Sequence, residues 1–233
     1  MNKKDEIYDR VVEDLIRAKY RFGDRILVKE LAAVTGYSRQ PIMTALGRLA
    51  SDGFVQIVPQ VGCQVVDPGR QAIADFYLMF SRMEGLLTEL AAARRTQREL
   101  RELADIQRRI TKFDNDDADA AQEYRVLNQA FHQLIHTMAR SPLLDERQRS
   151  LFSMSDFFIN QSIGFENLRT DVAREHDEIL EAISRQSLPA ARYAAEAHIA
   201  AVSAFVLAGI KSAARDTDGG QDPAAVSESA TAA

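Results

Sequence analysis

Short helical patterns separated by breaks fill the first third of the chain. The segment RFGD (21–24) ends a first amphipathic helix, and two further helices are predicted over 28–36 and 37–53. Two β-branched runs around PQVG then predict a hairpin over 54–66. The buried face of the first helix is expected to carry Ile7, Val11, Val12, Leu15 and Ile16. Three helices followed by a hairpin is the order of a winged helix-turn-helix.

From residue 69 onward, long amphipathic stretches follow one another with almost no strand signal. They run over 71–95, 97–112, 117–139, 142–163, 168–186 and 188–212. We therefore predict a mainly α fold with a winged helix-turn-helix domain over 1–68 and an all-α bundle of six to seven helices over 69–212. Residues 213–233 contain no aromatic side chain and few large apolar ones, so a disordered tail is expected there.

The composition is typical of a folded cytoplasmic protein. With 233 residues, 46% of them hydrophobic, the chain can bury a substantial core. No uninterrupted apolar run reaches the roughly 18 residues of a spanning helix, so no membrane partner is expected. The single cysteine, Cys63, excludes an intrachain disulfide and a cysteine-based zinc knuckle.

The charge is uneven along the chain. Residues 1–66 carry 10 Lys and Arg against 8 Asp and Glu, whereas the remainder carries 19 against 26. The N-terminal third is therefore the better candidate for meeting DNA phosphate.

The second helix of a helix-turn-helix lies in the major groove with its first turns facing base edges. Arginine pairs with guanine and glutamine with adenine, and other basic side chains reach phosphate. Contacts with operator DNA are thus expected from Lys29, Ser38, Arg39, Gln40, Thr44, Arg48 and, in the wing, Gly62. An ordinary surface helix also carries Ser, Arg and Gln, but the turn, the capped helix and the glycine-bearing hairpin together favour DNA binding.

The segment LVKELAAVTGYSRQPIMTALGRLASDGFVQIVPQVGCQV (27–65) resembles the DNA-binding module of the GntR family of bacterial transcription regulators. The matches to the family pattern are Leu31, Ala32, Gly36, Ser38, Arg39, Pro41, Ala45, Leu46, Leu49, Gly53, Val55 and Gly62. Met43 and Thr44 stand where the family usually has Arg-Glu. An apolar side chain able to contact a thymine methyl thus replaces a usual DNA-contacting arginine, and we expect an altered operator preference.

All four histidines lie in the predicted bundle. Asn128 and His132 are four residues apart and share one helical face. Over the eight residues from Asn128 to His136 that face drifts by about 80°, so one ion is not expected to bind all three. Histidines are also common in protein cores, where a hydrogen bond satisfies them. The spacing alone leaves metal binding and core packing open.

The segments FHQLIHTMARSPLL, REHDEILEAI and AAEAHIAAV resemble the FCD effector domain of the FadR-type branch of the GntR family. This resemblance implies a divalent metal at the floor of an internal pocket, with Asn128, His132, His176 and His198 as ligands. Three neutral imidazoles suit Zn²⁺ or Ni²⁺ and leave positions open for water or an effector.

Asn128 replaces the aspartate of that family pattern and brings no negative charge. We expect weaker metal binding and a stronger attraction for an anionic effector. The alternative is a decayed site whose histidines only form hydrogen bonds. His136 is expected to support a ligand from behind or to pack between helices.

A second departure from the family concerns the effector pocket. Phe80 stands where the family commonly has an arginine that holds an effector carboxylate, and Arg82 lies about 200° away around the helix. Glu84 matches the family's structural glutamate. The effector is therefore expected to contact the metal, Tyr77 and Phe80, with the alternative that Phe80 belongs to the core.

These features predict a ligand-responsive transcription regulator, and repression is the usual mode of the family it resembles. We expect a homodimer, because one recognition helix reads only a half-site. The expected effector is a small metabolite, such as an organic acid bound at the metal site.

The competing prediction is a metal-dependent enzyme that uses the three histidines. It lacks a well-placed general base, because Glu175 and Asp177 flank His176 but point to other faces. A helical adaptor that binds only protein would leave the exposed Ser38-Arg39-Gln40 turn and the wing unexplained. We therefore expect no enzymatic activity.

Overall fold

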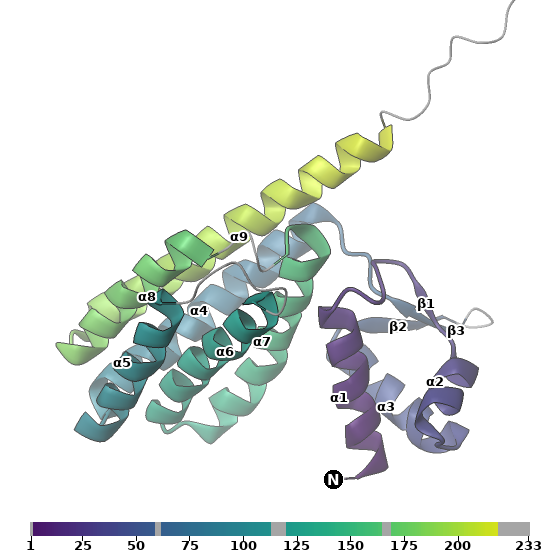
Figure 1. The fold of residues 1–233 in the computed structure, drawn as a ribbon, viewed down its shortest axis with the longest axis horizontal. Helices are drawn as coiled ribbons and strands as arrows, with labels where there is room; N and C mark the ends of the chain where they lie inside the picture. Colours follow the sequence, from purple (N-terminus) through teal and green to yellow (C-terminus); the bar gives the residue numbers. More distant parts are fainter. Residues whose placement is uncertain (1, 59–61, 113–119, 165–168, 219–233) are drawn as a thin grey trace, which may run out of the picture.

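The computed structural model describes residues 2–58, 62–112, 120–164 and 169–218. A small α/β unit lies beside a larger bundle of helices (Figure 1). Helix dominates the described residues, and strands occur only in the small unit within them. This arrangement confirms the predicted fold class.

The small unit contains helices α1 (Lys3–Ile16), α2 (Val28–Thr35) and α3 (Arg39–Ser51). Gly36 ends α2 in the left-handed conformation at φ 70°, which glycine adopts without steric cost. Ser38 is the N-cap of α3, although its side chain makes no capping hydrogen bond. The expected face of α1 is buried, with Ile7, Val11 and Leu15 fully enclosed.

The wing is a sheet of three strands, whereas the sequence predicted a two-stranded hairpin. Strands β2 (Val55–Val58) and β3 (Gly62–Val65) form the hairpin, and Ile57 pairs with Cys63 in antiparallel register. Strand β1 (Arg25–Ile26) adds to the other side of β3, giving the order β1-β3-β2. A strand of two residues carries too little alternation to be recognised from sequence.

Six helices form the bundle within the described residues: α4 (Arg70–Arg94), α5 (Gln97–Thr111), α6 (Ala120–Met138), α7 (Pro142–Ser162), α8 (Arg169–Ser184) and α9 (Leu188–Asp218). Each lies close to a stretch that the periodicity predicted. Helix α9 runs past the expected end at residue 212, because its alanine-rich sequence favours helix. The remainder of the expected tail, 219–233, lies outside the described residues.

Helices α4 and α9 run along one another through the bundle (Figure 1). The segment Leu188–Ile210 of α9 is long and apolar enough to cross a membrane by length and composition, although Arg192 and Glu196 interrupt it. The expectation of no such segment was therefore too strong. Ala191, Ala195, Ile199, Val202 and Val206 of α9 are buried, which gives this helix one apolar stripe packed into the bundle.

The two units share a continuous apolar contact. Phe22 packs edge-on against Phe157 of α7, with ring centroids 5.3 Å apart, and Phe54 lies 6.1 Å from the same ring. The side chain of Gln161 donates to the Tyr20 carbonyl at 2.9 Å, and that of Asn160 donates to the Ile16 carbonyl. The end of α1 is thus anchored on α7.

Candidate metal centre and nucleic-acid interface

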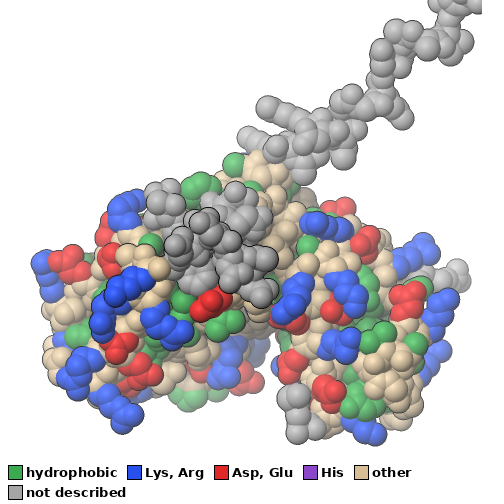
Figure 2. Space-filling view, in the orientation of Figure 1, with side chains coloured by type: hydrophobic (Ala, Val, Ile, Leu, Met, Phe, Trp, Pro, Cys, Tyr) green, Lys and Arg blue, Asp and Glu red, His purple; other side chains and the backbone are tan. Residues whose placement is uncertain are grey.

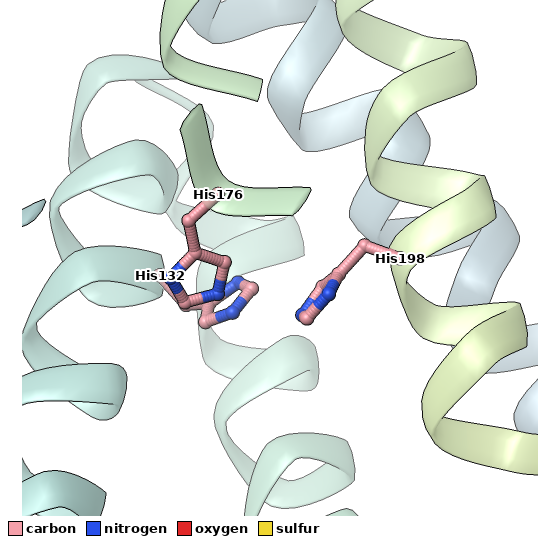
Figure 3. A group of neighbouring side chains, drawn as sticks. All are labelled: His132, His176 and His198. Carbon is pink, nitrogen blue, oxygen red and sulfur yellow. The ribbon is translucent and has the colours of Figure 1, made fainter. Parts of the chain in front are cut away.

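Three helices bring His132, His176 and His198 together in the bundle interior. One nitrogen of each ring lies within 4.8 Å of a nitrogen of the other two, and all three residues are buried. The rings extend from α6, α8 and α9 toward a common point (Figure 3). We call these residues the histidine cluster. The structure therefore brings together the three histidines singled out from the sequence.

Two members of the histidine cluster are oriented by carboxylates. The Nδ1 of His198 lies 2.8 Å from Glu175 Oε2, and the Nδ1 of His132 lies 3.3 Å from Glu84 Oε2. In a neutral ring whose Nδ1–H donates to a carboxylate, the lone pair of Nε2 remains free. Histidines that bind metals are commonly held in this way.

His176 has no hydrogen-bond partner on either ring nitrogen among the described residues. Its ring stacks on Phe131 at 4.2 Å, with an interplanar angle of 9°. Burial, followed by the neighbouring His198 and His132, holds the pKa of His176 well below its usual value. Burying an imidazole without a hydrogen-bond partner lowers the stability of a protein, because its ring nitrogens lose their hydrogen bonds to water.

Asn128 lies one helical turn before His132 on α6, so the two residues share a face. Its Oδ1 is buried and has no hydrogen-bond partner among the described residues. Three clustered imidazoles, one of them without a hydrogen-bond partner among the described residues, are a donor set that fits a borderline divalent ion such as Zn²⁺ or Ni²⁺.

His136 is outside the histidine cluster and supports it through Glu84. The Nε2 of His136 and the side-chain amide of Gln148 each lie 2.7 Å from Glu84 Oε1, while the other Glu84 oxygen meets His132. Burial alone would raise the pKa of Glu84, but the contacts with His136 and His132 outweigh it and hold that pKa well below its usual value. Glu84 is thus a buried carboxylate that orients a candidate ligand.

A cavity of about 430 Å³ reaches the histidine cluster from the gap between α6 and α7. Its lining residues are Val126, Gln129, Ala130, His132, Gln133, His136, Arg149, Phe152 and Ser153. Arg149 supplies the positive charge of this wall and pairs with Asp145 at 2.7 Å. The cavity is therefore polar on one side and shares His132 with the histidine cluster.

Tyr77 and Phe80, expected in the effector pocket, do not line this cavity. Both are buried in an aromatic cluster with Phe76 and Phe158, in which the Phe76 and Phe80 rings stack at 5.7 Å. The Tyr77 hydroxyl meets Ser155 rather than open space. The inward face of α4 at these positions meets the aromatic side chains of α7, so the alternative that Phe80 belongs to the core is correct.

The residues expected to contact DNA lie on the surface of the small unit. Those exposed to solvent are Lys29, Ser38, Arg39, Gln40, Thr44, Arg48 and Gly62. Figure 2 shows basic side chains mixed with acidic ones on the visible face of this unit, rather than a uniform basic patch.

Two side chains of α3 are less free to contact DNA than the sequence predicted. Arg48 lies over the Tyr8 ring at 3.9 Å and within 3.4 Å of Asp5, so α1 holds its guanidinium. Met43 is partly buried and packs against the core, which limits its reach toward a thymine methyl.

The pairing of Glu175 with His198 has no signal in the sequence. Glu175 is the neighbour of His176 in the chain, but its carboxylate reaches across to His198 on α9. Gln148 was missed entirely, because one amide in a helix gives no signal until its partner Glu84 is known.

Comparison with known proteins agrees with this architecture. Residues 75–201 match the model of the FCD domain, and residues 3–65 match that of the bacterial regulatory proteins of the gntR family. An uncharacterised HTH-type transcriptional regulator in an unstable DNA locus of Streptomyces ambofaciens is 27% identical over 219 residues, covering 86% of this chain and 83% of the relative. An uncharacterised HTH-type regulator of Mycobacterium tuberculosis is 29% identical over 199 residues, covering 83% and 77%.

Solved structures support the fold. Escherichia coli McbR/YncC superposes with a TM-score of 0.74 at 19% identity, covering 88% of this chain and 97% of the other. A putative GntR transcriptional regulator from Rhodococcus sp. RHA1 gives 0.70 at 16% identity, covering 89% and 99%. The matched families and relatives are transcription regulators rather than enzymes, which confirms the expectation for this chain.

Proposed function

Because this chain belongs to the GntR family of bacterial regulatory proteins and carries an FCD domain, we propose that it is a metal-containing repressor controlled by a small organic anion. The protein is a transcription regulator with a DNA-binding and an effector domain. The metal, the anionic effector and repression are the parts proposed here.

The observation that carries the proposal is the hydrogen bonding of the histidine cluster. His132 and His198 each direct Nδ1 to a carboxylate, and His176 has no partner on either nitrogen among the described residues. Neutral histidines that only stabilised a core would satisfy one another or a neighbouring group. These three, with Asn128, would hold the ion, and a bound ion would supply positive charge toward the cavity.

The side chains around the cavity favour an anion. Arg149 lies at its wall, and His136 and the amides of Gln129 and Gln133 also line it. Glu84 and Glu175 stand behind the ligands, where they offset part of the ion's charge. The neutral Asn128 leaves more of that charge for an effector than an aspartate would.

For DNA binding, we assign Ser38, Arg39, Gln40 and Thr44 to base edges and Lys29 to phosphate. The residues point outward from the first half of α3 and from α2. Two copies would read a palindromic operator in the bacterial cytoplasm. The outer face of α9 supports pairing, because Tyr193 is 75% and Phe205 39% exposed there.

Operator selection tests the residues assigned here to DNA contact. Purified full-length protein should enrich one palindromic sequence from random duplexes, with affinity that falls steeply as salt rises. Arg39→Ala should weaken binding to that sequence by roughly 10- to 100-fold, because a bidentate contact with guanine is lost. Arg101→Ala removes the same charge from exposed α5 and should leave affinity unchanged. Equal losses in both variants, or no enriched sequence, would refute the DNA-reading surface.

A further inference from the structure

We infer that Gln129, Asp156 and Arg125 form a relay that transmits occupancy of the cavity to the DNA-binding domain through Glu13. The inference rests on the proposed function, because it assigns a route for effector control. We call these four residues the interface cluster. They come from α6, α7 and α1.

The relay begins at the cavity wall. Gln129 is one of the lining residues, and its side-chain amide donates to Asp156 Oδ2 at 2.8 Å. A molecule in the cavity thus meets the same amide that satisfies a buried carboxyl on α7. The neighbouring Gln133 also lines the cavity but donates to Asp145 at 3.0 Å.

The middle of the relay is a buried ion pair. Asp156 is 1% exposed, and Arg125 Nη1 lies 3.6 Å from its Oδ2. The Arg125 side chain is itself only 7% exposed. Buried charges depend on every partner they have, so loss of the Gln129 hydrogen bond leaves Asp156 more dependent on Arg125.

The relay ends on the DNA-binding domain. Nη2 of Arg125 donates to both oxygens of Glu13, at 3.0 and 2.8 Å. Glu13 belongs to α1, which packs against the recognition helix α3, and Tyr8 of α1 donates to Asp52 at the end of α3 at 2.7 Å. One guanidinium is therefore shared between a carboxylate of each domain.

Because Arg125 is shared between Asp156 and Glu13, an anion bound in the cavity is expected to lower operator affinity. An anion that accepts a hydrogen bond from Gln129 withdraws this donor from Asp156. Asp156 then competes more strongly for Arg125, and the contact between Arg125 and Glu13 weakens. Helix α1 is held less firmly on the bundle, which favours an arrangement of the DNA-binding domain with lower operator affinity.

Amide hydrogen exchange of the full chain tests the relay without DNA or effector. Gln129→Ala imitates withdrawal of the amide, and we expect exchange over residues 7–16 of α1 to accelerate about tenfold. Gln133→Ala is the matched control, because it removes an amide from the same wall and should leave α1 at the wild-type rate. Amides of α4 and α9 should stay protected in both variants, which reports an intact fold.

A second variant shows whether the effects share one path. Glu13→Gln should accelerate exchange in α1 by itself, and adding Gln129→Ala should cause no further increase. Wild-type exchange of α1 in Gln129→Ala, or acceleration that adds to that of Glu13→Gln, would overturn the relay. Because the assay uses no DNA, its failure would leave the operator-selection result untouched. A failed selection would leave the coupling between the cavity and α1 standing but would remove its role in operator control.

Discussion

Helix α6 contributes to two groups of polar residues on neighbouring faces, and the two groups differ in how far their hydrogen bonds are satisfied. His132 belongs to the histidine cluster, with Asn128 one turn before it on α6, while Arg125 and Gln129 belong to the interface cluster. In the interface cluster, Gln129 bonds Asp156 and Arg125 bridges to Glu13. By contrast, the ring nitrogens of His176 and the Oδ1 of Asn128 have no hydrogen-bond partner among the described residues. The difference separates a hydrogen-bonded contact between two domains from buried polar atoms that lack a partner among the described residues.

The two groups also differ in charge. Burial lowers the pKa of His132 and His176, so these rings are neutral, which is the form that binds metal. Burial raises the pKa of Asp156 to about 7, against the opposing effects of Arg125 and Gln129. Burying the Asp156 carboxylate therefore costs free energy of folding, and removing Arg125 or Gln129 should lower the stability of the protein strongly.

Arg125→Met is expected to give the largest effect, because it breaks the interface cluster. It leaves Asp156 buried without its cation, and loss of one partner of a buried pair typically costs about 3–5 kcal/mol. Urea unfolding at pH 8 measures the loss. Arg108→Met is the control, since Arg108 pairs with Asp105 on the surface and should change stability by less than about 1 kcal/mol. Equal losses in the two variants would mean that the interface cluster adds no stability.

Asp156→Asn should change how stability depends on pH. A folded-state pKa near 7, above the usual 3.8, means that the folded chain retains a proton that the unfolded chain has lost. The contribution of Asp156 to the unfolding free energy should therefore fall as pH rises from about 4 to about 7 and level off above, by an amount on the order of a few kcal/mol.

The variant keeps an acceptor for Gln129 but cannot ionise beside Arg125 and Glu13. The difference in unfolding free energy between variant and wild type should grow in favour of the variant across that pH range. A constant difference from pH 4 to pH 8 would show that Asp156 does not titrate in the folded protein.

Glu175→Gln should produce a smaller effect, confined to the histidine cluster. The amide can still meet His198 but carries no charge, and loss of such a supporting carboxylate typically weakens metal binding by roughly 10- to 100-fold. Glu178→Gln, on the same helix but paired with Arg174 at the surface, should leave affinity unchanged. Competitive titration with a zinc chelator distinguishes the two. Equal zinc affinities of the two variants would show that Glu175 does not support His198 as a metal ligand.

The sequence predicted the helices of the bundle, and it singled out the three histidines that lie together in the structure. Helical periodicity is local, so the boundaries of α4 to α9 mostly fell within a few residues of the expected ones. Resemblance to a family motif singled out the three histidines, and the structure places their rings close together.

The supporting interactions could not be predicted, because they join residues far apart in the chain. Arg125 meets Glu13 over 112 positions, and His198 meets Glu175 over 23. Neither pair leaves a spacing signal. Tyr77 and Phe80 were misplaced for the same reason: an aromatic residue on an inward helix face fits a core or a pocket equally well until the packing helix is known.

Zinc stoichiometry tests the central claim most directly. Full-length protein, stripped with chelator and titrated with Zn²⁺, should bind one ion per chain with high affinity. The His176→Ala variant should bind at least about 100-fold more weakly, since it loses a direct ligand. His136→Ala provides the comparison: it removes a group that supports Glu84 rather than a direct ligand, so it should weaken zinc binding less than His176→Ala does. If wild type and His176→Ala bind zinc equally, or neither binds it, the three histidines form no metal centre.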